Sequence, residues 1–402
     1  MNILIFTQYF WPENFRINEV ARTLVEKGVK VEVLTGKPNY PTGLIYSDYK
    51  AYGLQKESRF NLMINRVPML ARGKGVLRLM LNYFSFIFSG LFFSPWLFRK
   101  RKYDVIFVYA PSPILQALPA IFLGWLKVTP VVIWVQDLWP QSLSATGYVK
   151  NKLLLKLVEN IVSFIYRHAD LLLVQSEAFI DPVRAMASGT PVRYYPNSAD
   201  ELSSDKSITE EDNSMFNGKF TILFAGNIGS AQAVEVIVEA ASLLKEYEDI
   251  QFVILGDGSR RDWMLHEKKS RNLNNLHLPG RFPANSMPFF MKKASALLVT
   301  LADNEIFRFT IPSKIQAYLA AGRPILACLN GESARIVLDA KAGLVVPAED
   351  AEALTSAILN LYKMPSKERD NMGKKGVLYC KQHFTHKILI DELINHFQSL
   401  KK

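Results

Sequence analysis

The chain has 402 residues, of which 49% are hydrophobic and 21% charged. This length exceeds one ordinary core and predicts about two domains, while the composition excludes a disordered chain. Two cysteines, Cys328 and Cys380, exclude a disulfide framework, and the six histidines show no metal-ligand spacing. We therefore expect no metal site and no cofactor.

The net charge of +11 is unevenly distributed along the chain. Residues 1–199 hold 23 Lys+Arg and 12 Asp+Glu, whereas residues 200–402 hold 25 of each. The whole positive excess therefore lies in the first half. This asymmetry predicts a negatively charged partner for that half alone, such as anionic lipid, a phosphorylated acceptor or nucleic acid.

The first half alternates short apolar runs with helical segments. Its first residues lack the basic start of a signal peptide, so we expect a buried strand there. Helices are expected at 17–27 and 151–168. The predicted strands are 2–6, 30–34, 62–66, 104–109, 131–136, 171–175 and 192–195. Such alternation is typical of parallel sheets built from βαβ units.

One segment, 77–98, departs from this alternation because it is almost wholly apolar and aromatic. Its length just suffices to span a bilayer, and basic residues flank it on both sides. A transmembrane helix, a buried core helix and an interfacial helix are the three alternatives. The aromatic content and the basic flanks favour the interfacial helix.

Residues 197–217 are polar, acidic and rich in serine, which predicts a linker. A second series of strands follows at 221–225, 251–255, 275–278, 296–300, 324–328 and 343–346. Two consecutive doubly wound α/β domains are therefore expected. Ligands of such sheets bind at the carboxyl ends of the strands, so the cleft between the domains is the expected site.

Glycine-rich turns follow three strands of the second half. A glycine lets a phosphate or sugar approach the backbone, although each turn alone is also consistent with an ordinary tight turn. In the third turn an arginine could pair with a phosphate and an aromatic ring could stack on a base. The turn residues are Gly226, Asn227, Gly229, Ser230 and Gln232, then Gly256, Asp257 and Gly258, then Arg281 and Phe282.

A fourth turn, within residues 311–325, precedes a short helix. Pro312 fixes the backbone ahead of the helix, Ser313 can cap its first turn, and Lys314 lies beside the first helical amides. Helix amides together with a lysine suit a phosphate or another anion, although a simple capped helix has the same pattern. All four turns should line one crevice.

Two loops of the first half combine aromatic and polar residues. Residues 8–16 include Asn14, Phe15 and Arg16, and residues 136–142 include Asp137 and Trp139. These residue types suit sugar and phosphate contacts at strand ends, although a packed surface loop and a capping Asp137 are alternatives. No Walker A lysine loop, no Gly-x-Gly-x-x-Gly after the first strand and no Asp-x-Asp motif occur.

As an ordered set, the four turns and the run from Ala320 to Pro324 resemble glycosyltransferase family 4. The loops at 8–16, 35–41 and 137–140 are similar to those of the bacterial branch that assembles O-antigen and capsule repeat units. That branch includes transferases of N-acetyl-L-fucosamine type. The resemblance covers essentially the whole chain.

The resemblance implies a GT-B fold of two Rossmann-like domains facing across a cleft. The expected domains are 1–198 for the acceptor and 199–385 for the nucleotide sugar, with helix 386–402 packing back on the first. It implies metal-independent transfer, with retention of anomeric configuration, from a nucleotide sugar, expected to be UDP-linked, to a polyprenyl-diphosphate-linked sugar. The expected location is the inner face of the bacterial inner membrane, with an anionic membrane surface and no nucleic acid as partner.

Residue roles follow from the same resemblance. Asp137, Arg281 and Lys314 are expected to act in catalysis. The expected donor contacts are the turn residues above, together with Pro312, Ser313, Lys314 and Gln316. The expected acceptor contacts are Asn14, Phe15, Arg16, Asn39, Tyr40, Asp137 and Trp139.

The chain departs from the family pattern at several positions. Phe309 and Ala317 stand where the family has two glutamates, and Asn227 and Gln232 replace an arginine and a lysine. Gln136 replaces a histidine. Gln316 is then expected to contact the ribose, and Lys314 and Arg281 to be the main phosphate cations. The missing glutamates leave a scaffold subunit of a polysaccharide assembly complex, or a sugar-nucleotide epimerase, as alternative functions.

Overall fold

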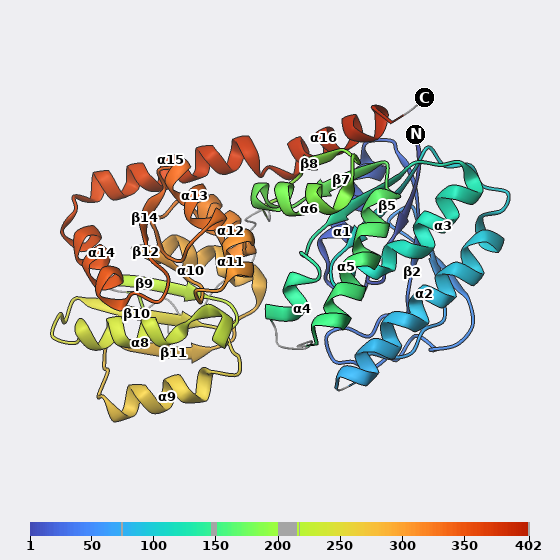
Figure 1. The fold of residues 1–402 in the computed structure, drawn as a ribbon. Helices are drawn as coiled ribbons and strands as arrows, with labels where there is room; N and C mark the ends of the chain where they lie inside the picture. Colours follow the sequence, from blue (N-terminus) through green and yellow to red (C-terminus); the bar gives the residue numbers. More distant parts are fainter. Residues whose placement is uncertain (74, 146–150, 200–214, 217, 401–402) are drawn as a thin grey trace. The chain divides into compact units, whose positions relative to one another are not determined.

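The computed structural model describes residues 1–73, 75–145, 151–199, 215–216 and 218–400 (Figure 1). Most of the predicted linker lies outside the described residues. The chain forms two compact units, one of Met1–Asn197 with Lys387–Lys402 and one of Ser198–His386. Each unit is a parallel α/β sheet with helices on both faces, so the predicted doubly wound class is confirmed.

The first unit holds an eight-stranded sheet of order β3-β4-β2-β1-β5-β6-β7-β8 among its described residues. All neighbours pair in parallel except β3 and β4, which are antiparallel. The strands are β1 (Asn2–Phe6), β2 (Lys30–Thr35), β3 (Gln55–Arg59), β4 (Leu62–Arg66), β5 (Val105–Ala110), β6 (Val131–Val135), β7 (Leu171–Val174) and β8 (Val192–Tyr194). The sequence analysis missed β3, because this edge strand is polar throughout and mostly exposed.

Helices cover both faces of this sheet. They are α1 (Arg16–Glu26), α2 (Val76–Phe98), α3 (Leu118–Lys127), α4 (Gln141–Ala145), α5 (Lys152–Arg167), α6 (Ile180–Ala187) and α16 (His386–Gln398), with single 3-10 turns at Ile114–Ala117 and Glu177–Phe179. The α1 and α16 helices share one core with the strands. In α16, Leu389, Ile390, Leu393 and Phe397 are buried there, and the Phe397 ring lies 5.2 Å from that of Phe107.

On the other face, α2 and α3 pack closely against each other. An added Cβ on Gly90 of α2 would come within 2.9 Å of Pro119 in α3, and the Phe86 ring lies 6.0 Å from that of Phe6 in β1. Along the rest of α2 the side chains are largely outside the core, since only 22% of its most apolar window is buried. By length and composition α2 could cross a membrane. The alternative of a buried core helix is therefore wrong.

The second unit holds a six-stranded parallel sheet of order β11-β10-β9-β12-β13-β14. Its strands are β9 (Phe220–Ala225), β10 (Ile250–Leu255), β11 (Leu276–Gly280), β12 (Ala296–Thr300), β13 (Ile325–Cys328) and β14 (Gly343–Val346). Its helices are α8 (Val234–Leu243), α9 (Arg261–Ser270), α10 (Met287–Lys293), α11 (Glu305–Phe309), α12 (Ser313–Ala321), α13 (Glu332–Asp339), α14 (Ala351–Lys363) and α15 (Ser366–His383), with 3-10 turns at Ser230–Gln232 and Ala284–Ser286.

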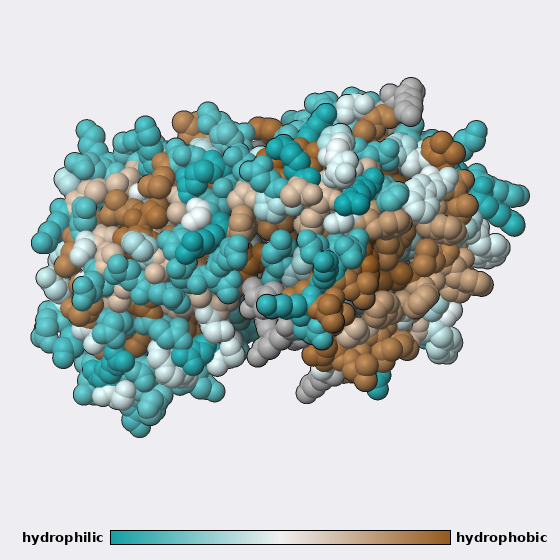
Figure 2. Space-filling view, in the orientation of Figure 1, coloured by the Kyte–Doolittle hydropathy of each residue, from teal (hydrophilic) through white to brown (hydrophobic). Residues whose placement is uncertain are grey.

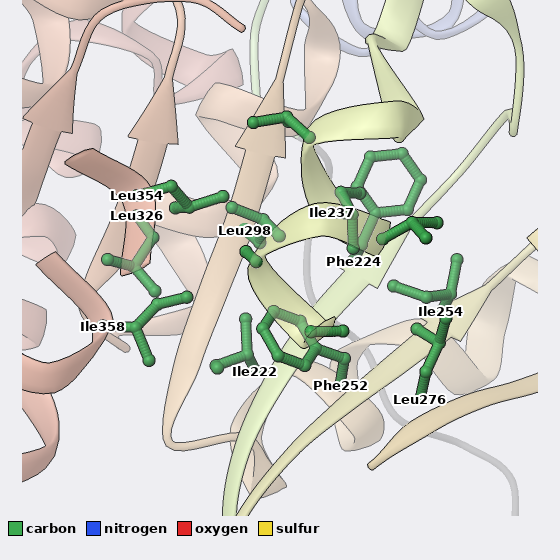
Figure 3. Close-up of a cluster of buried hydrophobic side chains, with 14 of the residues drawn as sticks. Ile222, Phe224, Ile237, Phe252, Ile254, Leu276, Leu298, Leu326, Leu354 and Ile358 are labelled. Carbon is green, nitrogen blue, oxygen red and sulfur yellow. The ribbon is translucent and has the colours of Figure 1, made fainter. Parts of the chain in front are cut away.

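The core on one face of this sheet joins the central strands to α8 and α14 (Figure 3). Ile222, Phe252 and Leu298 from the strands meet Ile237 of α8 and Ile358 of α14, and all five side chains are buried. Strands covered on both faces read as continuous apolar runs, which explains why the sequence reveals them. This packed sheet fixes the positions of the loops at its carboxyl edge.

Candidate functional site

Three glycine turns lie against one another at the carboxyl edge of the second sheet. Gly226 follows β9, and its backbone N–H donates to Leu255 at 2.8 Å, while the Gly256 N–H donates to Gly280 at 2.8 Å. An added Cβ on Gly256 would lie 1.8 Å from the Gly226 carbonyl oxygen. Gly256 also has a φ of +142°, so glycine is required for both space and conformation.

Lys314, the second residue of α12, lies directly against this glycine stack. An added Cβ on Gly226 would come within 2.6 Å of its Cε atom. Its Nζ atom is buried, has no hydrogen-bond partner among the described residues, and lies 3.5 Å from the centroid of the Phe224 ring. Burial lowers the pKa of Lys314 to about 7. A buried amino group without an anionic partner is ready to bind one.

The rest of α12 places further polar groups beside Lys314. Tyr318, one turn later, holds the end of β9, because its hydroxyl accepts a 3.0 Å hydrogen bond from the Ala225 N–H. Sequence reasoning missed Tyr318, although the i, i+4 spacing from Lys314 predicts a shared helix face. Gln316 is 2% exposed, and neither amide atom has a partner in the described part of the chain. Ala317 is half-buried.

The start of α12 differs from the prediction for Ser313. Pro312 occupies the N-cap position, and no side-chain hydrogen bond caps the helix. Ser313 is already the first helical residue, and it is exposed. The predicted cap is wrong because Pro312, with an extended backbone, takes the position from which a side chain would cap. The Ser313 hydroxyl is left free of that role.

The first glycine turn also differs in how it meets its helix. A 3-10 turn, Ser230–Gln232, and Ala233 in a left-handed conformation separate Gly229 from α8. The first amides of α8 are therefore separated from the glycine turn. The Asn227 side-chain amide instead donates to the side-chain Oε1 atom of Gln232 at 3.1 Å, so these two amide side chains order the turn.

The remaining predicted donor residues lie near the second and third turns. Asp257 is exposed and accepts from the Gly258 N–H at 2.8 Å, which keeps its carboxylate within its own turn. Arg281 is exposed directly after β11. Phe282 is half-buried and packs edge-to-face on Phe290, with ring centroids 4.7 Å apart. Part of the Phe282 ring thus belongs to the core.

In the first unit, Glu13 ties two strand-end loops together. It is 2% exposed, and its carboxylate accepts from the N–H groups of Asn39 and Tyr40, each at 2.8 Å, and of Phe10 at 3.3 Å. Burial raises the pKa of Glu13 to about 7, against the lowering effect of these hydrogen bonds. Glu13 lies in the loop of residues 8–16, but the sequence analysis assigned it no role. A buried glutamate in a loop indicates a carboxylate that accepts hydrogen bonds from neighbouring backbone N–H groups.

Aromatic rings gather around the loops that Glu13 connects. The Tyr9 and Phe15 rings stack at 5.0 Å, and Phe15 and Tyr40 lie 5.3 Å apart. Arg72 lies 5.5 Å from the centre of the Tyr40 ring. Asn14 is exposed, and Arg16 is half-buried and forms a 3.6 Å ion pair with Glu19. Aromatic faces beside an arginine suit a sugar that carries a phosphate.

Two predicted acceptor contacts, Asn39 and Trp139, are buried and form hydrogen bonds within the first unit. Asn39 is fully buried, and its side chain donates to the Lys37 carbonyl and accepts from the Arg72 N–H. Trp139 is 5% exposed, and its indole N–H donates to Ser112 at 3.1 Å. Asp137, at the end of β6, is half-buried, and burial raises its pKa to about 6.

Asn82 connects α2 to the same loops. Its side chain is fully buried, accepts from the Gln8 amide at 2.8 Å and donates to the Leu70 carbonyl. The aromatic loops and the apolar helix are therefore one hydrogen-bonded assembly. A metal-binding group of three or more His, Cys, Asp or Glu side chains is absent from the described residues.

Known proteins share both units. The family described as glycosyl transferase 4-like domain matches residues 14–198, and glycosyl transferases group 1 matches residues 205–378. The protein is a glycosyltransferase. The predicted enzyme class is thereby confirmed.

Two curated relatives from bacteria are also described as glycosyltransferases. The probable glycosyltransferase WbjE of Pseudomonas aeruginosa is 29% identical over 289 residues, or 68% of this chain and 70% of its own. The putative colanic acid biosynthesis glycosyl transferase WcaI of Escherichia coli is 23% identical over 80% of this glycosyltransferase and 82% of its own length.

Solved structures share the fold at low identity. HepE of Anabaena, crystallised with UDP, has a TM-score of 0.71 at 12% identity, with both chains covered completely. Sucrose-phosphate synthase of Thermosynechococcus elongatus has a TM-score of 0.72 at 15% identity, covering 99% of this glycosyltransferase and 98% of that chain. The predicted GT-B class is confirmed.

Proposed function

We propose that this glycosyltransferase moves a sugar from a UDP-sugar to a polyprenyl-diphosphate-linked acceptor in the synthesis of a bacterial surface polysaccharide. The transfer retains anomeric configuration and needs no metal. The donor is a sugar of N-acetyl-fucosamine type, as the resemblance of the loops at 8–16 and 137–140 indicates. The protein works as a peripheral protein on the inner face of the inner membrane.

The buried amino group of Lys314 against the glycine stack carries the donor half of this proposal. A nucleotide sugar brings a diphosphate, and the closely stacked turns allow it to approach the backbone. Lys314 then provides the charge that Asn227 and Gln232 lack. The exposed Arg281 supplies a second cation. The side-chain amide of Gln316 has no partner among the described residues, which supports its assignment to a ribose hydroxyl. The UDP in the HepE crystals supports the choice of nucleotide.

In the proposed reaction, the acceptor hydroxyl attacks the anomeric carbon on the face from which the diphosphate leaves. The bond from that carbon to the diphosphate oxygen breaks, and the departing oxygen takes the hydroxyl proton. Lys314 and the turn amides stabilise the charge that develops on the diphosphate. No protein nucleophile is required, and Asp137 orients an acceptor hydroxyl.

The acceptor half rests on the first unit. Its excess of positive charge, its aromatic loops with Arg72 and the adjoining apolar helix α2 together match a sugar joined through diphosphate to a lipid. A small soluble acceptor would use only the aromatic loops. The relation to WcaI, described as a putative colanic acid biosynthesis glycosyl transferase, agrees with a polysaccharide pathway.

Turnover with a defined acceptor tests the proposal. The purified protein is incubated with undecaprenyl-diphosphate-linked N-acetylglucosamine and a panel of UDP-sugars, with a chelator present. We expect one added sugar by mass spectrometry and the donor's anomeric configuration by NMR. Donor binding without transfer across the panel, or transfer only to soluble sugars, would contradict it.

A further inference from the structure

We propose that α2, α3 and α5 together form one docking face that seats the first unit on an anionic lipid bilayer. The proposal rests on the membrane location proposed above and deepens it, because it adds two helices to α2. It thereby defines how the first unit is oriented on the membrane.

The α2 helix contributes the longest apolar stripe. Leu77, Phe84, Phe88 and Phe92 recur at spacings of seven, four and four residues, so they share one side of the helix. All four are exposed, and Phe92 is 76% exposed. The opposite side carries Asn82 and packs on the sheet and α3. The helix is thus anchored by one side and leaves the other without a partner in the described residues.

The α5 helix adds a second apolar stripe at the same kind of spacing. Leu153, Leu157 and Phe164 are exposed, and Leu153 is 80% exposed. Phe164 meets Trp125 of α3, with ring centroids 6.1 Å apart, so α3 and α5 are neighbours. Figure 2 shows hydrophobic surface extending over the region where Figure 1 labels α2 and α5.

The end of α3 carries an unusual exposed residue, Val128. Val128 has a φ of +51° and is 94% exposed. A β-branched residue is disfavoured in this left-handed conformation, where glycine is usual. The exposed valine side chain also contributes no burial energy to the fold. An apolar environment over Val128 explains its presence, since burial in lipid would offset both costs.

The charges around the docking face favour an anionic bilayer, rather than a second copy of the chain, as the partner that covers it. The three helices carry a single acidic residue, Glu159. The basic run Arg99–Lys102 follows α2, and the Lys127 amino group donates to the Arg101 carbonyl at 2.8 Å, which holds this run beside the end of α3. Two copies would bring these cations together, whereas anionic headgroups would neutralise them.

Vesicle binding of α5 variants provides the test. The double variant Leu153→Ser with Leu157→Ser should bind phosphatidylcholine–phosphatidylglycerol vesicles about tenfold more weakly or worse, because two apolar side chains no longer enter the lipid. The matched control, Leu338→Ser with Leu378→Ser, alters similarly exposed leucines of the second unit. It should bind like the wild type, and wild-type binding should weaken on phosphatidylcholine alone.

Val128→Gly separates docking from folding. It should raise the thermal midpoint, because glycine tolerates the left-handed backbone, and at the same time weaken vesicle binding. Loss of binding only in Phe88→Ser with Phe92→Ser, and not in the α5 variant, would reduce the face to α2 alone and overturn the proposal. The proposal would also be overturned if light scattering showed a wild-type dimer that becomes a monomer in the α5 variant.

Transfer to a short-chain, water-soluble analogue of the acceptor keeps this proposal separate from the proposed function. The docking variants should turn over that analogue at the wild-type rate. Vesicle binding without any transfer would support the docking face while sinking the proposed reaction. Transfer without any vesicle binding would do the reverse.

Discussion

The two units place ionisable groups at their strand ends in opposite ways. The second half of the sequence has no net charge. In the second unit, the Nζ atom of Lys314 is buried without a hydrogen-bond partner among the described residues, and the glycine turns around it expose backbone groups. In the first unit, a buried glutamate is fully engaged by three N–H groups. An unpaired buried group indicates a ligand, whereas a satisfied one indicates a structural tie. We therefore propose that Lys314 binds a ligand and that Glu13 positions the loops around it.

Gly256→Ala should have the largest effect, and it is confined to the second unit. The added Cβ would meet the Gly226 carbonyl oxygen at 1.8 Å, and backbone atoms cannot yield as a flexible side chain can. We expect a loss of about 4 kcal/mol in stability, measured by hydrogen exchange of β9 and β10 amides. Gly218→Ala, in the same unit and also at positive φ but with nothing within 4 Å, is the control. An equal loss of stability in both variants would show that the close packing of the turns is not the cause.

Glu13→Ala should destabilise the first unit by about 3 kcal/mol, because three buried N–H groups lose their acceptor. The loss should appear in hydrogen exchange of β1 and β2 and leave β9 unchanged. Glu13→Gln keeps one carbonyl oxygen and should recover part of the stability. If Glu13→Ala instead abolished transfer with the fold intact, Glu13 would be a catalytic group rather than a tie.

The pKa of Glu13 gives a further, smaller signal. Its folded pKa of about 7 lies above the ordinary value of 4.5, so the folded state binds the proton more tightly. This group therefore stabilises the fold fully below about pH 4.5, and that contribution is lost as the pH rises through 7. Wild type should lose stability relative to Glu13→Gln over this interval in denaturant titrations. A pH-independent difference would show that the hydrogen bonds outweigh burial.

Arg281→Ala should have the smallest effect. Arg281 is exposed, so its removal should leave stability unchanged and weaken UDP binding about tenfold through one lost charge-assisted hydrogen bond. Isothermal titration calorimetry measures the affinity. Arg323→Ala is the control in the same unit and should bind UDP normally. It removes an arginine that donates to the Lys292 backbone carbonyl.

The sequence predicted the sheets well because their strands are continuous apolar runs. It could not predict β3, which is held by pairing at a polar edge, nor the roles of Asn39 and Trp139. Those two looked like ligand contacts by residue type, but burial gives them internal hydrogen-bond partners. The approach of Lys314 to Gly226 joins residues 88 positions apart, so only the packing of α12 beside β9 reveals it.

The affinity of Lys314 variants for UDP tests the central claim most directly. Lys314→Met should preserve the fold, since an apolar side chain suits the buried position, and weaken UDP binding by about a hundredfold. Burial lowers the pKa of Lys314 from 10.5 to about 7, so wild type should also lose affinity for UDP as the pH rises above about 7 and the amine deprotonates, whereas Lys314→Arg should not. Unchanged affinity in a folded Lys314→Met protein would contradict the account.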